Sequence, residues 1–274
     1  KDIILDEKCK IIWKDNVIAR LKRGNNYLNP EIEVLADDAL DESSKSKLEV
    51  FLKNWVNAYI KEILGDLLNL NKESVSNKYI RALMFQLFEN NGVIKRELVN
   101  EIVKEIKIDE RKKIWDLGIK IGRYHIYLPK MLKPKAVSLR ISLWRLFYQL
   151  ASSQDIPRSG LNYLNDKKYN KNFLLLCGFE KFKNHYVRID ILEKLFIKIL
   201  NKTDKRKFKI DAEMINLIGC NKESFYNLIL SMNYKKSKEP DTYYYTGENK
   251  RKTKFINLRK NENPFKKLLA LNLK

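Results

Sequence analysis

The stretch from Leu48 to Leu68, LEVFLKNWVNAYIKEILGDLL, decides the fold of this chain. Large apolar side chains return at every third or fourth position, which places them along one face of an α-helix. These side chains belong to Leu48, Phe51, Leu52, Trp55, Val56, Tyr59, Ile60, Ile63, Leu64, Leu67 and Leu68. The period therefore predicts a long helix, centred on Trp55, whose apolar face lies in the core.

The segment before this helix carries a different pattern. Between residues 10 and 36, short runs of apolar residues alternate with the turn-forming residues 14–16 and 24–26. Apolar runs of this length, separated by turns, are typical of paired strands. We therefore expect a small antiparallel β-sheet of three strands near the N-terminal end of the chain.

Helical periods continue after the long helix, at 80–88, 95–106 and 109–117. The first of them ends at Asn90-Asn91-Gly92, because Asn and Gly tolerate the left-handed backbone of a helix end. Asp109 is the expected N-cap of the third, since its carboxylate can accept hydrogen bonds from free backbone N–H groups. We expect Gly118 to end that helix.

The helical period is interrupted between Gly118 and Pro134. This segment contains two prolines and predicts an ordered connector rather than a helix. A helix resumes near Ala136 and turns its leucines inward. We expect Arg140 and Arg145 to stay at the margin of that helix.

The second half of the chain is predicted to follow a hinge at 152–166, which contains Pro157 and Gly160. Further helical periods lie at 172–177, 190–200, 211–218 and 222–232, and two short extended pieces are expected at 179–182 and 186–188. Only Gly219-Cys220-Asn221 separates the last two, which is the spacing of a helix-turn-helix. Beyond them we expect a hairpin wing, with strands at 233–238 and 253–258 and a polar tip at 239–252.

Together these elements predict a mainly α fold with a small N-terminal antiparallel β-sheet, a helical bundle and a C-terminal winged-helix-like α+β unit. The expected domains are a β segment at 1–36, a helical accessory domain at 37–165 and a helical region at 166–274 that carries the basic wing. No self-similar period of about 20 to 50 residues occurs, so the sequence predicts no solenoid of repeats.

The chain carries 55 Lys and Arg residues against 34 Asp and Glu residues, which gives a net charge of +21. Such an excess favours a polyanionic partner such as RNA or DNA. Lys, Asn and Ile are all abundant, so a coding bias that leaves a basic, solvated surface is the alternative.

Compartment and context follow from three further features. Cys9, Cys177 and Cys220 are too few and too widely spaced for a disulfide framework, which favours a reducing, cytoplasmic location. No run of about 18 apolar residues is present, so we expect no membrane-spanning helix. The chain does not begin with Met, and we expect it to be part of a longer protein.

Residues for several kinds of catalysis are missing. No glycine belongs to a loop that ends in Gly-Lys-Ser/Thr, the arrangement that binds nucleotide phosphates and Mg²⁺. The chain has two histidines, His125 and His185, as candidates for the base of a serine-type triad, and no serine motif accompanies them. The spacing of the cysteines does not match that of a zinc-binding site. We therefore expect no catalytic residue, no metal site and no cofactor in this chain.

Flat rings and cations alternate in the connector before Pro134. This first candidate site consists of Arg123, Tyr124, His125, Lys130 and Lys133. Such side chains stack on bases and neutralise phosphates in single-stranded nucleic acid. The alternative is structural, with Tyr124, Ile126 and Leu128 filling a core beneath the connector.

A second candidate site lies in the predicted wing. Its cations are Lys222, Lys235, Lys236, Lys250, Arg251, Lys252 and Lys254. Helix-turn-helix proteins place such cations, and the start of their second helix, against phosphates. A hairpin whose lysines are only solvated is the alternative.

Several segments, in the same order along the chain, resemble the C-terminal region of a bacterial family of superfamily-two, DEAD/DEAH-box-like helicases related to the mitochondrial RNA-degradosome helicase. They are FQLFENNGV (85–93), GRYHIYLP (122–129), LKP (132–134), VRIDIL (187–192), MINLIGC (214–220) and NPFKKL (263–268). The Tyr-His-Ile-aromatic-Leu-Pro segment is the most specific of them.

The resemblance implies an accessory, nucleic-acid-binding region of an ATP-dependent RNA or DNA helicase. The ATPase motor, with its ATP and Mg²⁺, would lie outside this chain and act on it in cis. RNA or DNA is the implied partner, and RNA-processing proteins are further partners that the resemblance allows. A non-catalytic helical scaffold for protein interactions is the alternative function.

Overall fold

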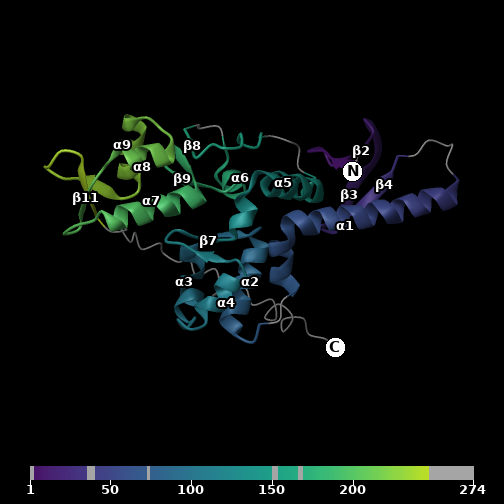
Figure 1. Cartoon of the computed structure of the whole chain (residues 1–274), viewed down its shortest axis with the longest axis horizontal. Coiled ribbons are helices and arrows are strands. Elements are labelled where there is room, and N and C mark those ends of the chain that lie inside the picture. The colour runs from purple at the N-terminus through teal and green to yellow at the C-terminus, as the bar shows by residue number, and fades with distance from the viewer. Residues whose placement is uncertain (1–2, 36–40, 73–74, 150–153, 166–168, 247–274) are drawn as a thin grey trace, which may run out of the picture.

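The structure is a computed structural model that describes residues 3–35, 41–72, 75–149, 154–165 and 169–246 (Figure 1). Helices make up about 49% of these residues and strands about 23%. The chain is therefore a mixed α+β protein, and the expectation of a mainly α fold underestimated its strands. Outside the N-terminal sheet each strand has two to four residues. The extended pieces expected at 179–182 and 186–188 are confirmed as strands, whereas most of the others are too short to leave a clear alternating pattern.

The N-terminal sheet has four strands, one more than expected. They are β1 (Ile3–Leu5), β2 (Lys10–Trp13), β3 (Asn16–Asn26) and β4 (Asn29–Val34), antiparallel and in chain order. The chain approaches itself closely between β3 and β4, where a Cβ on Gly24 would lie 2.0 Å from the carbonyl oxygen of Asn29. Only glycine fits this position.

The long helix predicted from the sequence is confirmed as α1 (Glu42–Lys72). It contacts β4 and α5 (Pro134–Tyr148). Its buried residues are Leu52, Val56, Ile60, Leu64, Leu67 and Leu70, and its backbone departs from helical geometry at Leu64. Trp55 lies at the edge of the core, where its ring stacks on that of Tyr59 with centroids 5.4 Å apart.

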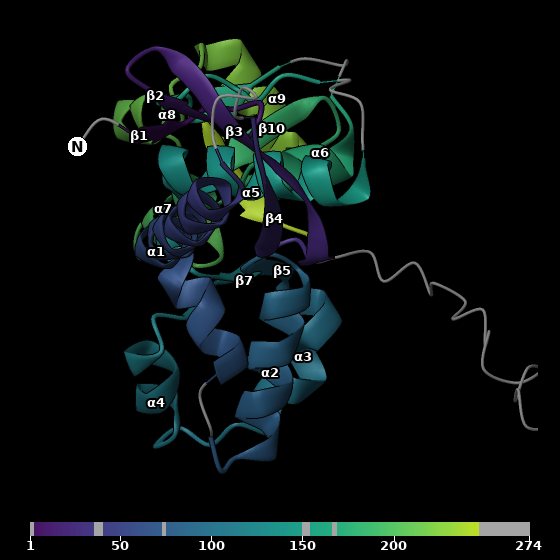
Figure 2. The ribbon, with the colours of Figure 1, turned by 90° about the vertical axis from the view of Figure 1, so that its right-hand side faces the viewer.

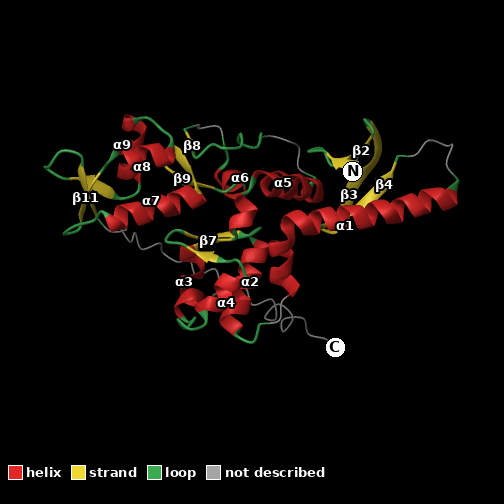
Figure 3. Ribbon diagram, in the orientation of Figure 1, coloured by secondary structure: helices red, strands yellow, loops and turns green. Residues whose placement is uncertain are grey.

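Three consecutive units that share one order of strands follow (Figure 3). The second has one helix between its first two strands, and the first and third have two. The first unit contains α2 (Lys78–Glu89), β5 (Val93–Lys95), α3 (Arg96–Lys104), α4 (Arg111–Asp116), β6 (Lys120–Ile121) and β7 (His125–Tyr127). The second contains α5, β8 (Tyr163–Leu164), α6 (Lys171–Leu176), β9 (Phe179–Phe182) and β10 (His185–Arg188), with the short helix η1 (Pro129–Leu132) before it. The third contains α7 (Ile189–Asn201), β11 (Lys207–Lys209), α8 (Ala212–Ile218), α9 (Lys222–Ser231), β12 (Tyr234–Lys236) and β13 (Thr242–Tyr245).

Each unit has its own antiparallel sheet of three strands. The strand orders are β5-β7-β6, β8-β10-β9 and β11-β13-β12, so the first strand of each unit always pairs with the last. Before each final hairpin, the second residue after the end of the helix has a left-handed backbone: Gly118 (φ 74°), Gly178 (φ 88°) and Asn233 (φ 67°). The shared strand order is therefore accompanied by a shared backbone feature at the end of the helix.

Local patterns predicted most helix ends, with one exception. Asn91 and Gly92 adopt the left-handed backbone that ends α2, as expected. At α4, however, Asp109 is not the N-cap, because the helix begins after Glu110, whose side chain makes no capping hydrogen bond.

The C-terminal hairpin also differs from the prediction. Its second strand, β13, lies at 242–245, inside the segment expected to be a polar tip, and pairs with β12. Tyr243 and Thr242 are buried there against the third unit, which makes this strand part of a core. The strand expected at 253–258 lies outside the described residues.

Arg140 is buried rather than at the margin of its helix. Its guanidinium donates hydrogen bonds to the backbone carbonyls of Asn91, Met131 (2.8 Å) and Leu176 (3.1 Å). These carbonyls lie at or just beyond the C-terminal ends of α2, η1 and α6, where backbone oxygens lack helical partners and carry partial negative charge. Burial lowers the pKa of Arg140 to about 10, so it stays protonated at neutral pH.

The main hydrophobic core joins the N-terminal sheet, α1, the first unit and α5, whereas a separate core fills the third unit. Figure 2 shows α2, α3 and α4 grouped below the N-terminal sheet. The domain boundaries at 36 and 165 stay a prediction. Among the helices of the described ranges, none is long and apolar enough to cross a membrane.

Candidate nucleic-acid interface

A single buried carboxylate holds the tip of the β6–β7 hairpin. Glu193 comes from α7 of the third unit and is 3% exposed. Its Oε2 accepts a hydrogen bond from the backbone N–H of Arg123 at 2.6 Å, and its Oε1 accepts from those of Tyr124 at 2.9 Å and His125 at 3.0 Å. Three backbone N–H groups at the tip therefore converge on the two oxygens of one carboxylate.

Gly122 makes this close approach possible. A Cβ at this position would lie 2.3 Å from Cδ of Glu193, closer than two such atoms can approach. The carbonyl of Gly122 accepts a hydrogen bond from Nη1 of Arg96 at 2.9 Å. The tip is thus fixed from both sides, by an anion and by a cation.

Tyr124, at the same tip, packs between the other two units. Its ring meets Phe182 of β9 edge-on at a centroid distance of 6.1 Å and Phe196 of α7 at 5.9 Å. Burial raises the pKa of the Tyr124 phenol, so the hydroxyl stays protonated. The β6–β7 hairpin therefore joins all three units at one point.

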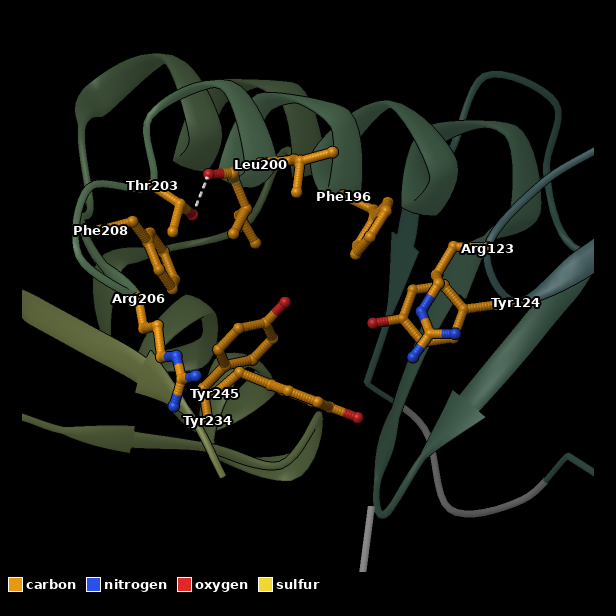
Figure 4. A pocket seen from close by; sticks show the side chains of 10 residues that line it. Arg123, Tyr124, Phe196, Leu200, Thr203, Arg206, Phe208, Tyr234 and Tyr245 are labelled. Atoms are coloured by element: carbon orange, nitrogen blue, oxygen red, sulfur yellow. Dashed lines mark hydrogen bonds between the residues drawn. The ribbon is translucent and has the colours of Figure 1, made fainter. Parts of the chain in front are cut away.

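A cavity of about 440 Å³ opens on one side of this tip (Figure 4). Arg123 and Tyr124 form one wall, and the end of α7 forms another. The third unit supplies the remaining rings. The lining residues are Arg123, Tyr124, Phe196, Ile199, Leu200, Thr203, Arg206, Phe208, Tyr234 and Tyr245.

A second cavity, of about 470 Å³, lies on the other side of Tyr124 and is more polar. Here Glu180 accepts from Nζ of Lys95 at 2.5 Å and lies 2.8 Å from Nε2 of His125. Burial raises the pKa of Glu180, but the hydrogen bonds from His125 and Lys95 outweigh it and hold that pKa below its ordinary value. The cations of this cavity are therefore engaged by groups of the protein itself.

The first candidate site is divided by the structure. Arg123 and Tyr124 line both cavities, whereas His125 is buried in β7. Lys130 lies on η1 and donates to Oδ1 of Asp66 at 2.9 Å. Lys133 is exposed between η1 and α5. Neither lysine lines either cavity.

The described lysines of the second candidate site all lie exposed on the third unit. Lys222 begins α9, with its Nζ 3.8 Å from Oδ2 of Asp241. Lys235 and Lys236 lie on β12, opposite Tyr244 and Tyr243. The remaining members, Lys250, Arg251, Lys252 and Lys254, lie outside the described residues.

Sequence reasoning missed several residues that shape the two cavities. Glu193 carried a signal, because it is an acid on the apolar face of its helix, four residues after Ile189 and three before Phe196. Glu180 carried none, since its partners Lys95 and His125 lie far away in the chain. Tyr245 did carry one, because it is the last of three consecutive tyrosines in the predicted wing, where such rings stack on bases or shape a turn.

Among the residues that the structure describes, no group of three or more His, Cys, Asp or Glu side chains could hold a metal ion. Cys9, Cys177 and Cys220 form no disulfide. Comparison of the chain with protein-family models, with curated proteins and with solved structures finds no match.

Proposed function

We propose that this chain is the C-terminal accessory, nucleic-acid-binding region of an ATP-dependent RNA or DNA helicase, and that its third unit is a winged helix. The topology of that unit supports the assignment: a helix, a strand, two helices separated by three residues, and a hairpin. The ATPase motor would lie in cis, outside this chain.

The observation that carries the proposal is the position of Lys222, Lys235 and Lys236. They are exposed at the start of α9 and on the hairpin beside it, the two elements with which such units contact phosphates. Asn221 caps α9 by accepting from the N–H of Ser224 at 2.8 Å, which fixes the direction of the helix start. Contacts of this kind position a strand without reading its sequence.

The distribution of charge along the chain supports a polyanionic partner. Residues 1–41 contain seven Lys and Arg against nine Asp and Glu, whereas residues 247–274 contain nine against two. A coding bias would raise lysine in every segment. The acidic balance of the N-terminal segment therefore favours a basic surface that serves a partner.

The test measures binding of a fluorescein-labelled U12 RNA by fluorescence anisotropy over a series of salt concentrations. Replacing both Lys235 and Lys236 by Gln should weaken binding and flatten the slope of log affinity against log salt by about 0.7 for each phosphate that is no longer neutralised. The matched control replaces Lys53 and Lys61, exposed on α1, by Gln and removes the same charge. Equal slopes for the two double variants would contradict the proposal.

A helical protein-interaction scaffold is the second candidate, favoured by apolar side chains of the first unit that face solvent. Leu98 is 70% exposed, Ile108 80% and Trp115 74%. Exposed apolar side chains of this size can bind a protein surface. A wild-type chain without measurable affinity for U12 at physiological salt would favour this function over the first.

A further inference from the structure

The cavity beside the β6–β7 tip combines aromatic walls with cationic side chains. Five of its ten lining residues carry rings: Tyr124, Phe196, Phe208, Tyr234 and Tyr245. Two others, Arg123 and Arg206, carry guanidinium groups, and no Asp or Glu is among the described residues that line it. Its volume of about 440 Å³ is in the range of sites that enclose a small planar group.

The rings form two groups that face each other across the cavity (Figure 4). Tyr124 and Phe196 form one group, with centroids 5.9 Å apart. In the other, Tyr234 contacts Phe208 at 5.3 Å and Tyr245 at 5.2 Å. The hydroxyl ends of the tyrosines point into the space between the groups, where they can donate to and accept from the edge of a bound ring.

The two arginines reach this space from different units. Arg206 lies in a tight turn of the third unit, closed by hydrogen bonds between Asp204 and Lys207 at 2.8 and 2.7 Å, and has a left-handed backbone. Arg123 extends from the hairpin tip with its guanidinium carbon 5.9 Å from the centre of the Phe196 ring. Positive charge is thus present on opposite sides of an aromatic cavity (Figure 4).

We propose that this cavity binds one unstacked base of a single-stranded nucleic acid, with the flanking phosphates near Arg123 and Arg206. Every base has a flat face that stacks on an aromatic ring, so the site would accept all four bases. Among the residues with a described position, no carboxylate lines the cavity to attract a cationic ligand, and the arginines favour an anionic one. This inference rests on the proposed function, because it names the part of the nucleic acid that the region holds.

Tyr245 and its neighbour Tyr244 provide a matched pair for the test. They are 40% and 37% exposed, but only Tyr245 lines the cavity. Tyr245→Ala should weaken binding of the full chain to U12 between about 5-fold and about 140-fold with the salt slope unchanged, because it removes a stacking ring and no charge. Tyr244→Ala should leave the affinity as it is, and Tyr245→Phe should retain it.

A second readout reports on the base itself. U12 with a single central 2-aminopurine should change its fluorescence on binding to the wild type and to Tyr244→Ala, and much less on binding to Tyr245→Ala. Arg206→Gln should flatten the salt slope by about 0.7, whereas Lys205→Gln, in the same turn but outside the cavity lining, should leave it unchanged.

The outcomes separate the two proposals. If wild type binds U12 but Tyr245→Ala and Tyr244→Ala bind equally well, with equal urea midpoints, the base site is wrong and nucleic-acid binding stands. If wild type does not bind U12, the proposed function fails and the base site with it.

Discussion

The β6–β7 and β12–β13 hairpins occupy the same position in units of the same topology, yet they face different surroundings. The first is clamped at its tip by Glu193 and packs against the two other units. The second exposes Lys235, Lys236 and its tip residues 238–240 to solvent. Topology alone therefore does not determine what a hairpin contacts; the residues at its tip and their partners do.

Residue choice at the tips explains the difference. Gly122 has no side chain, so a carboxylate can approach the backbone N–H groups that follow it. In the other hairpin the corresponding turn contains Pro240 and Asp241, and Asp241 accepts from the hydroxyl of Tyr226, within its own unit, at 2.6 Å. The backbone N–H groups at the tip of the first hairpin are therefore bound by a residue of another unit. The side-chain hydrogen bond at the second tip is made within its own unit.

The largest expected effect is that of Glu193→Ala. A buried N–H without an acceptor costs about 1–3 kcal/mol, and this change removes the acceptor of one buried and two partly buried N–H groups. Urea unfolding should therefore show a loss of several kcal/mol in the free energy of unfolding. Lys194→Ala, at the exposed next position of α7, is the control and should change little. Similar urea midpoints for the two variants would show that the hydrogen bonds to Glu193 do not stabilise the hairpin tip.

Gly122→Ala should have the next largest effect. The added methyl group would overlap the carboxylate of Glu193, and overpacking of this kind costs about 1–3 kcal/mol. In the Glu193→Ala background the same change should cost much less, since the overlapping group is gone. Additive losses in the double variant, measured by urea unfolding, would contradict the contact.

A smaller, pH-dependent effect is expected from Glu180, beside the clamped hairpin. Its pKa is held below the ordinary value in the folded protein, so its contribution to stability is present above pH 4.5 and is lost as the pH falls through the folded pKa. The difference in unfolding free energy between wild type and Glu180→Gln should shrink between pH 6 and pH 3. A difference that stays constant would show that the ion pair with Lys95 is not formed.

The smallest effect is expected in the exposed hairpin. Tyr226→Phe removes a single, partly buried hydrogen bond to Asp241. Thermal unfolding should show a smaller decrease in Tm than any variant of the clamped hairpin. A decrease as large as that of Glu193→Ala would abolish the contrast between the two hairpins.

Sequence patterns predicted the features that neighbouring residues determine. The apolar period of α1, the left-handed end of α2 at Gly92 and the turn between α8 and α9 were all visible in the chain. Strand β13 was missed, because a four-residue strand depends on pairing with two others.

The candidate site was predictable only in part. Arg123 and Tyr124 stood out as a cation and a ring in a segment bounded by prolines. Their partners Glu193, Phe196 and Tyr245 lie about 70 to 120 residues further on, and only the fold brings them together. Arg140 was misplaced because a buried arginine normally needs an acid, whereas here backbone carbonyls replace it.

Arg140 also sets an order of events during synthesis. Two of its carbonyl partners, Asn91 and Met131, precede it in the chain, but Leu176 follows it by 36 residues. At ordinary translation rates that carbonyl is made between about 2 and 7 seconds later. Until then the guanidinium lacks one acceptor and remains hydrated, because a buried charge without its partners is strongly disfavoured. The packing around Arg140 can therefore be completed only after α6 has been synthesised.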